Sequence, residues 1–426
     1  MLRWRDAGRA GGPLEKHGSQ VEAVIALLGV GVADARARLA DGRGDDVPGR
    51  VLDLHHVWDF YRSRLILRHV RGYRRYLDVA DEIAWECYRQ VPDLPGTRPK
   101  EPPLVGFGRA ASPRAHRRGS AYHDLLPRGG IHTREGREAA ARLPFPVVDV
   151  PWYFGSHLPA LLTVAHETAH HVDDDCGLGE EIRRRVAAAG LPPDRTVHWE
   201  RWAGEAFADV CAAVVCGPAY AVVLTELLDT GQDVDERDFD GPHPPPAFRV
   251  RLADAAARAV GCTAARKGAD DDPETGAVAD ALLTGGWSGL HGKSLPGLLA
   301  PAGPPAADAA EGAVRLLAGG PSRCSSATGV VAAAALAFQR DPVAYERQAA
   351  GERAVAEVLR LRVPGTRAAG PDPAAHSAHR RAHAAAGDAV LAALDAAAGA
   401  DDTFRRERAG AAADPTRRTD RAGDGR

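Results

Sequence analysis

The segment His166-Glu167-Thr168-Ala169-His170 carries the residue types that a hydrolytic metal site takes from one helix. Two histidines four residues apart lie on one face of a helix, so both imidazoles can reach one metal ion. Glu167 lies on the adjoining flank, where its carboxylate can accept a proton from metal-bound water. We therefore expect one Zn²⁺ ion held by His166 and His170, with Glu167 as the general base. The pattern specifies only three residues, so its context has to support it.

A hydrolytic zinc site takes three protein ligands and leaves a fourth position to water, so a third ligand is needed. A His six residues after His170 would complete the metzincin pattern, which also has a Gly in between. Here these positions hold Cys176 and Asp173, so that pattern fails. Glu180 and Glu181 follow on a predicted loop and could fold back toward the two histidines.

Glu205 and Asp209 are the stronger candidates, four residues apart on the next predicted helix. That spacing places both acids on one helix face. One can bind the metal while the other accepts the free N–H of a ligand histidine and thereby sets its tautomer. Gly204 and Ala208 are small enough to let this helix approach the first one closely. A buried acidic pair with no basic residue at helical spacing is costly unless a cation neutralises it, and zinc would do so.

With these residues, the stretch 143–260 resembles zinc metallopeptidases of gluzincin type, whose motif is HExxH followed on a later helix by ExxxD. The resemblance implies a zincin-like fold around the site. The residues it implies are the zinc ligands His166, His170 and Glu205, the general base Glu167, and Asp209 as the support of a ligand. It also implies that 147–150 is the edge strand along which an extended peptide pairs by strand addition.

The chain departs from that group in two respects. Gly204 stands where an Asn often precedes the Glu ligand, and no Tyr or His farther along clearly matches the residue that stabilises the oxyanion. Tyr220 and His243 are the candidates for this role. Tyr220 is also a candidate for the core, and His243 precedes three prolines and could be a turn residue. His171 is interpreted as a surface neighbour of the motif.

Helical periodicity dominates the chain and predicts an α+β fold that is mainly α-helical, with a small sheet in a zincin-like core. Residues 144–151 form a short strand bracketed by prolines, which is typical of an edge strand. Ser156 is the expected N-cap of the helix that carries the two histidines and runs to about Val172. The helix with Glu205 is expected from about Val197 to Cys216, where Gly217-Pro218 ends it.

Composition divides the chain into five parts, with helical regions flanking the core. They are a flexible N-terminus (1–20), a helical N-terminal unit (21–140), the catalytic core (141–262), an Ala/Gly-rich, loosely built helical C-terminal region (263–400) and a disordered tail (401–426).

The 426 residues have a net charge of −3 and are 45% hydrophobic, so no overall charge draws the chain to nucleic acid or membrane. No signal peptide or membrane span is recognisable, which predicts a cytoplasmic protein, although leaderless export would leave no mark. The six cysteines form no CxxC, which argues against a zinc ribbon and a dense disulfide framework. Between His166 and Asp240, 17 acids against six arginines favour substrates with positive charge near the cut.

A peptide or protein is the expected substrate, and two other hypotheses compete. The chain could be a non-catalytic zincin-fold sensor or scaffold with structural zinc, in which case the fourth zinc position would be closed. Alternatively, the arginines between Arg62 and Arg75 could bind nucleic acid, although the surrounding acids favour a salt-bridged helix face. His376, His379 and His383 share a helix face and could hold a second metal, but an exposed Ala-rich helix is the simpler interpretation.

Overall fold

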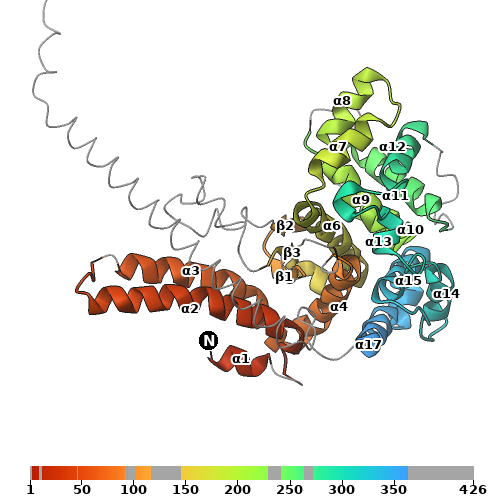
Figure 1. The fold of residues 1–426 in the computed structure, drawn as a ribbon. Coiled ribbons are helices and arrows are strands. Elements are labelled where there is room, and N and C mark those ends of the chain that lie inside the picture. The colour runs from red at the N-terminus through yellow and green to blue at the C-terminus, as the bar shows by residue number, and fades with distance from the viewer. Residues whose placement is uncertain are drawn as a thin grey trace, which may run out of the picture. The chain divides into compact units, whose positions relative to one another are not determined.

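The computed structural model describes residues 2–8, 12–45, 47–91, 94, 102–116, 145–228, 241–262 and 272–362. Within these residues the protein is mainly helical with one small three-stranded sheet, as predicted (Figure 1). None of the described helices is both long and apolar enough to cross a bilayer. The chain divides into two compact units: Met1–Val21, Arg62–Arg117 and Phe145–His376 form the first, and Glu22–Tyr61, Arg118–Pro144 and Ser377–Arg426 the second.

The described part of the second unit comes from two long helices, α2 (Gly18–Ala40) and α3 (Val47–Ile66). The two helices touch where Gly31 meets Leu54, because a Cβ at Gly31 would lie 2.5 Å from Leu54 Cδ2. Val24 and Val57 are also buried in this unit. The missing side chain of Gly31 therefore makes room for a leucine of the opposite helix.

The sheet lies in the first unit and has the strand order β1-β3-β2. Its strands are β1 (Leu104–Gly108), β2 (Arg114–His116) and β3 (Val147–Pro151). β3 pairs in parallel with β1 and antiparallel with β2, and all five of its residues are buried. The prediction that 147–150 is an edge strand is therefore wrong. Its prolines do not interrupt the ladder, since Pro151 ends the strand and Pro146 contributes only its carbonyl, which accepts from Leu104 N.

Asp149 on the central strand is held by two basic side chains. Arg64 donates from Nε (2.9 Å) and Nη2 (2.6 Å) to the two carboxylate oxygens, and His116 Nε2 lies 2.8 Å from Oδ2. Burial by itself would raise the pKa of Asp149, but the His116 hydrogen bond and the Arg64 charge outweigh it and lower that pKa. The ionised carboxylate therefore ties β3 to β2 and to the end of α3.

Asp149→Asn is expected to lower the free energy of unfolding at pH 7 by about 2 kcal/mol or more, because it leaves Arg64 half-buried without its charge partner. A carboxyl whose folded pKa lies below its unfolded value of about 3.9 stabilises the fold above that pH. The difference between wild type and variant should therefore shrink as the pH falls from 4 through the lowered folded pKa. Urea unfolding at several pH values measures this difference.

Glu180→Gln is the matched control, because Glu180 is 80% exposed and pairs only with the nearby Arg183. Its effect should stay within about 0.5 kcal/mol at every pH. An Asp149→Asn variant as stable as this control would show that the Asp149 contacts contribute nothing to folding.

The helix that carries both histidines is α6 (Thr163–Cys176), and it starts later than predicted. Two 3-10 helices precede it, η3 (Trp152–Ser156) and η4 (Leu158–Leu162). Ser156 is not an N-cap, because its hydroxyl donates to Tyr153 O instead of accepting from a helix N–H. α6 ends at Gly177, whose φ of 65° places it in the left-handed region that glycine adopts without strain.

The predicted helix from Val197 to Cys216 is in fact two helices, α8 (Pro193–Arg201) and α9 (Ala203–Cys216). The chain turns at Trp202, whose indole is buried and donates to Gly241 O at 3.0 Å. Burying this large side chain accounts for the break. Gly217, with a φ of 59°, ends α9 as predicted, and α10 (Pro218–Leu228) follows.

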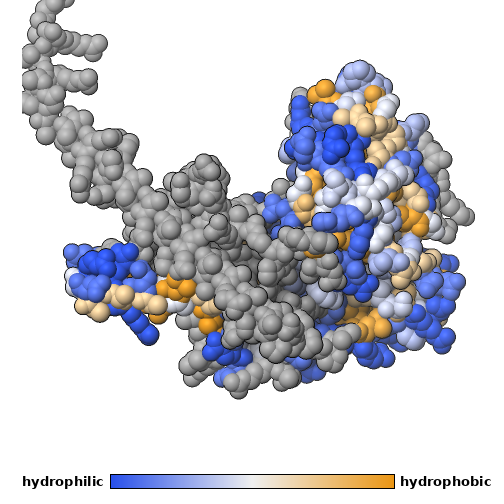
Figure 2. Space-filling view, in the orientation of Figure 1, coloured by the Kyte–Doolittle hydropathy of each residue, from blue (hydrophilic) through white to orange (hydrophobic). Residues whose placement is uncertain are grey.

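The remaining helices surround this centre. They are α1 (Leu2–Ala7), η1 (Glu15–His17), η2 (Leu67–His69), α4 (Arg71–Tyr88), α7 (Gly179–Ala187), α11 (Pro246–Ala259), α12 (Pro273–Leu283), η5 (Ser288–Leu290), α13 (Leu295–Leu299), α14 (Ala309–Leu317), α15 (Ala327–Arg340), α16 (Pro342–Arg347) and α17 (Ala350–Leu361). α7 illustrates their amphipathic character, since Ile182 and Val186 are buried while Arg183 and Arg184 are exposed. Figure 2 shows hydrophilic residues on the surface in the region of this helix.

The region from 273 to 362 is well packed, which corrects the prediction of a loosely built C-terminal region. Its buried side chains belong to the same apolar core cluster as those of α4, α6 and α9. Glu86 on α4 accepts from the N–H groups of Ala327 (2.7 Å) and Thr328 (2.9 Å), the first residues of α15. Alanines that look uninformative in the sequence are the small residues that let these helices approach closely.

The boundaries of the five parts predicted from composition also differ from the boundaries of the two compact units. In the stretch predicted to be a flexible N-terminus, His17 is buried and its Nε2 lies 3.0 Å from Asp81 Oδ2. α4, which was placed with the N-terminal unit, packs on α6. The predicted helix at 373–398 and the predicted tail at 401–426 lie outside the described residues.

Candidate metal centre

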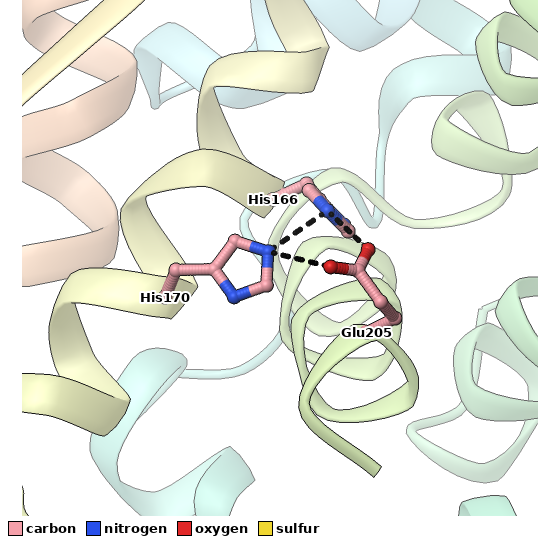
Figure 3. Close-up of side chains that lie close together, drawn as sticks. All are labelled: His166, His170 and Glu205. Carbon is pink, nitrogen blue, oxygen red and sulfur yellow. Dashed lines mark hydrogen bonds and ion pairs between the residues drawn. The ribbon is translucent and has the colours of Figure 1, made fainter. Parts of the chain in front are cut away.

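Three side chains from two helices converge on one point (Figure 3). His166 and His170 project from α6, and Glu205 projects toward them from the first turn of α9. The two imidazole Nε2 atoms lie 3.2 Å apart. Glu205 Oε2 lies 3.3 Å from His166 Nε2, and Glu205 Oε1 lies 3.5 Å from His170 Nε2. The structure thus brings together the three residues that were predicted as ligands.

These distances fit a shared cation. Two ligand atoms about 2.0–2.2 Å from one Zn²⁺ at tetrahedral angles lie about 3.3–3.6 Å apart. The Nε2 atoms are 3.2 Å apart, and each lies 3.3 or 3.5 Å from the nearer carboxylate oxygen of Glu205, which is close to that spacing. Among the described residues, this is the group of His, Cys, Asp and Glu whose ligand atoms all lie within 4.8 Å of one another. Two nitrogens and a carboxylate are a donor set that zinc accepts.

Asp209, one turn after Glu205, supports the ligand His166 from behind. His166 Nδ1 lies 2.9 Å from Asp209 Oδ1, so Nδ1 carries the proton and Nε2 is turned toward the ligand set. The carboxylate is fully buried and also accepts from Tyr220 Oη at 2.6 Å. Arg249 on α11 donates to both of its oxygens, from Nε and from Nη2, each at 2.8 Å. Asp209 therefore accepts hydrogen bonds from three residues around the ligand set: His166, Tyr220 and Arg249.

The pKa values reflect the strong coupling of these groups. Burial disfavours the charged form of His166, but the Asp209 carboxylate outweighs it and raises the His166 pKa to about 10. Burial would raise the pKa of Glu205, but His166 and the other nearby cations lower it to about 2. Arg249 and His166 also hold the pKa of the buried Asp209 well below its usual range. A metal ion that binds Nε2 would have to displace a proton from His166.

The charges around the ligand set leave room for a divalent cation. Three carboxylates, those of Glu167, Glu205 and Asp209, face one guanidinium, that of Arg249, while His166 and His170 are neutral as ligands. Three negative charges against one positive charge leave an excess of two. Buried carboxylates in such excess are costly unless they are compensated, and an ion of charge +2 compensates them in full.

Glu167 lies beside the ligands on α6 without joining them. Burial raises its pKa, and the Glu205 charge also raises it, whereas His166 lowers it. The backbone N–H of Ala115 on β2 hydrogen-bonds the carboxylate, which connects Glu167 to the edge strand of the sheet. A carboxylate with a raised pKa takes up a proton more readily than an ordinary Glu, which suits a group that must first accept a proton and then donate it.

The site lines a cleft with a volume of about 480 Å³, within the range of about 300–1,000 Å³ that is usual for ligand pockets. Besides the three ligand residues and Glu167, its walls contain Ala111–Ala115 of the edge strand and the turn before it, Tyr153, Thr163, Tyr220, Leu224, Leu227, Leu228, His243 and Arg249. The ligand set is therefore accessible from the cleft, and β2 forms one of the cleft walls.

The two oxyanion candidates both lie at the cleft, in different settings. Tyr220 is buried, and its hydroxyl is bonded to Asp209 and lies 3.2 Å from His166 Nδ1, on the far side of the imidazole from Nε2. That geometry argues against Tyr220 as an oxyanion donor. His243 has a side chain that is 56% exposed, and its Nε2 lies 3.7 Å from Glu205 Oε1. Of the two, His243 is the one that faces the cleft.

Other candidates from the sequence have structural roles. Glu181 accepts from the N–H groups of Ser288 (3.0 Å) and Gly289 (3.1 Å), and Glu180 pairs with Arg183, so neither is placed as a ligand. His171 is buried rather than on the surface, and its Nε2 lies 3.3 Å from Val147 O of the sheet. His376, His379 and His383 lie outside the described residues.

The arginines of the 62–75 stretch are paired within the protein. Arg64 binds Asp149, and the fully buried Arg68 donates from Nη2 to Asp81 at 2.7 Å. Arg75 lies in an ion pair with Glu352. These contacts match the interpretation as a salt-bridged helix face and leave these three guanidinium groups with internal partners.

Arg249 and strand β2 belong to the site and were not predicted from the sequence. Arg249 precedes the buried residues Leu252, Ala253 and Ala256 at spacings of three, four and seven, so it lies on the buried stripe of α11. A cation on such a stripe indicates a buried acidic partner and could have been found. β2 has only three residues in a Pro- and Gly-rich stretch, and its sequence carries no comparable signal.

Comparison of the chain with protein-family models, with curated proteins and with solved structures gives no match.

Proposed function

We propose that this protein is a zinc-dependent metallopeptidase with His166, His170 and Glu205 as ligands and Glu167 as the general base. The observation that carries the proposal is the convergence of the two imidazole Nε2 atoms and the Glu205 carboxylate, one ligand atom of each within 4.8 Å of the others, beside Glu167 on the wall of an open cleft. The ExxxD pair with Asp209 behind His166 supports the resemblance to gluzincins, and a zincin-like core is part of the same proposal.

The peptide substrate is assigned to the free edge of β2, in place of β3. Among the described residues β2 pairs with β3 alone, and its residues line the cleft. The N–H of Ala115 already reaches Glu167, so a segment paired with this edge by strand addition would pass the ligand set. The proposed peptide path therefore runs along β2, next to the central strand β3 that the sequence predicted for it.

The residues divide the hydrolysis between them. Zinc, when bound, would polarise the scissile carbonyl and lower the pKa of its water to about 7. The Glu167 carboxylate accepts a proton from the attacking water and then donates it to the leaving amine, for which its raised pKa is suited. Asp209 keeps the proton of His166 on Nδ1, and Arg249 holds Asp209 in place. His243, at the rim, is our candidate donor to the carbonyl oxygen.

Two observations favour catalysis over the alternative of a scaffold with structural zinc. Structural zinc sites use four protein ligands and are closed, whereas this site offers three and faces a cleft. A structural site also has no use for a carboxyl group such as that of Glu167, which has a raised pKa and lies beside the ligands without joining them. For the nucleic-acid alternative, the internal ion pairs of Arg64, Arg68 and Arg75 reduce the charge available to phosphates.

The test combines metal analysis with peptide hydrolysis. Purified protein should contain about one zinc per chain and cleave members of a mixed peptide library detected by mass spectrometry. A chelator should remove the zinc and the cleavage together, and one equivalent of Zn²⁺ should restore both. Cleavage that persists after zinc removal, or zinc-loaded protein that cleaves no peptide, would count against the proposal.

Asp209→Asn is expected to weaken zinc binding by about 10- to 100-fold. The amide cannot match the carboxylate that fixes the His166 tautomer, and it leaves the buried Arg249 without its charge partner. The zinc dissociation constant, measured in competition with a chromophoric chelator, checks this effect.

Tyr220→Phe provides the comparison, because it removes one hydrogen bond to Asp209 and keeps the carboxylate. Its dissociation constant should change by only a few-fold. Equal affinities for wild type and Asp209→Asn would mean that Asp209 does not support the metal ligand.

A further inference from the structure

Arg114 is the unpaired positive charge of the cleft. It lies on β2, is exposed, and lines the cleft with its neighbour Ala115. Within the described residues Arg114 forms no ion pair or hydrogen bond through its side chain. Arg249, the other guanidinium of the cleft wall, is bonded twice to Asp209 and is only 11% exposed. Arg114 is therefore the guanidinium that remains available to a ligand.

The charges around the ligand set also show that Arg114 is available to a ligand. Glu167, Glu205 and Asp209 against Arg249 leave an excess of two negative charges, which a Zn²⁺ ion would neutralise. Arg114 is not needed in that balance, so it leaves the zinc-loaded cleft with one net positive charge from fixed side chains. A cleft with low-dielectric walls concentrates the field of such a charge and draws ligands of opposite sign.

The described acids of the 166–228 stretch do not offset this charge at the cleft wall. The described acids of the cleft wall are Glu167 and Glu205, both at the ligand set. Glu180 lies on the outer surface of α7, and Glu181 is bound to the backbone of η5. Among the described residues, the excess of acids on which the expectation of positively charged substrates rests is therefore not found at the cleft wall.

We propose that Arg114 selects substrates by binding a carboxylate of the peptide close to the scissile bond. This inference rests on the proposed peptidase function and concerns its substrate class. Ala115, next to Arg114, reaches Glu167 through its N–H. Side chains on paired strands meet at about 5 Å when directly opposite and about 7–8 Å on the diagonal. The carboxylate therefore belongs to a residue one or two positions from the bond that is cut.

Two kinds of carboxylate have this chemistry, an internal Asp or Glu side chain and a free C-terminus. A set of four labelled peptides with a common cleavable core separates them. One has an internal Glu and an amidated end, one an internal Gln and an amidated end, one an internal Gln and a free carboxyl end, and one an internal Lys and an amidated end.

Wild type should have the highest kcat/KM for a peptide with a carboxylate, and Arg114→Ala should lower that value about fivefold, mainly through KM. The loss should be confined to the peptide whose carboxylate Arg114 binds, which identifies the internal or the terminal source. Arg114→Glu should favour the Lys peptide. The preference should shrink at 0.5 M salt, because exposed charges are screened.

Arg109→Ala and Arg109→Glu are the matched controls, since Arg109 is an exposed arginine close to Arg114 in sequence and outside the cleft wall. They should leave the preference unchanged. An Arg114→Ala variant that changes all four peptides equally, or none of them, would overturn the proposal while leaving the peptidase function intact.

A binding measurement keeps the two proposals separate. The dissociation constants of the four peptides are measured by fluorescence anisotropy on zinc-loaded Glu167→Gln protein, with and without Arg114→Ala. Tighter binding of a carboxylate peptide that depends on Arg114 supports the inference even if no peptide is hydrolysed. Equal dissociation constants for all four peptides would overturn it.

Discussion

Glu167→Gln should lower kcat for peptide hydrolysis by about 10²- to 10⁴-fold and leave the zinc content unchanged. The glutamine has almost the same shape and keeps the ligand set intact, but its amide cannot accept the proton of the attacking water. Glu167 is suited to that task because burial raises its pKa and the Ala115 N–H orients its carboxylate. The measurement compares turnover of one peptide by wild type and variant, with zinc content determined on the same samples.

Glu200→Gln is the control for this change, because Glu200 is an exposed glutamate on α8 away from the cleft wall. It should retain full turnover. If Glu167→Gln keeps more than about a tenth of the wild-type kcat with its zinc in place, Glu167 is not the general base.

Removing a ligand has the second large expected effect. His166→Ala and Glu205→Gln should each reduce zinc from about one per chain to a small fraction after dialysis, because two remaining ligands are too few for a stable site. Mass spectrometry of the metal content measures this loss. Both variants should also lose hydrolysis at zinc concentrations that saturate wild type.

Zinc should also stabilise the fold, since it binds the native site and not the unfolded chain. At 1,000 times its dissociation constant a ligand contributes about 4 kcal/mol. A chelator should therefore lower the Tm of wild type and have little effect on Glu205→Gln.

His55→Ala controls for the loss of a histidine, because His55 is 62% exposed and pairs only with the nearby Asp59. Its zinc content and its response to chelator should equal those of wild type. Full zinc occupancy in Glu205→Gln would remove Glu205 from the ligand set and leave the third ligand unassigned.

Arg249 explains how the acidic pair on α9 is tolerated. The sequence analysis attributes the neutralisation of Glu205 and Asp209 to a metal alone, because no basic residue lies at helical spacing on the same helix. In the structure, α11 supplies a guanidinium 2.8 Å from Asp209 and 3.8 Å from Glu205. Part of the compensation is therefore built into the protein, and with Glu167 counted as well, two negative charges remain for a divalent ion.

The strand assignment shows where sequence patterns fail. The prolines around 147–150 predict an edge strand, because proline removes a ladder donor. Whether a strand has one neighbour or two depends on segments that are distant in sequence, and here β1 and β2 both pair with β3. Both partner strands lie in a Pro- and Gly-rich stretch, so local composition gave no sign that this strand has two neighbours.

What the sequence determined by itself is the part that depends on helix geometry alone. His166 with His170, and Glu205 with Asp209, are each four residues apart, so a helix places each pair on one face wherever it lies in the fold. The helical character of most of the chain follows from the same short-range periodicity. These relationships need only neighbours within one or two turns, and they are present in the structure.

Only the tertiary structure decided which groups complete the site. It brought Glu205 to the histidines across 34 intervening residues, paired Asp209 with Arg249 and placed Ala115 at Glu167. It also placed Arg114 in the cleft wall, with no partner among the residues that the structure describes. It also made the Ala-rich C-terminal helices part of the core. These features depend on how separate helices and strands pack together. The free energy of that packing comes from buried apolar surface and from charge pairs between residues far apart in the sequence. No local pattern of residues records that packing.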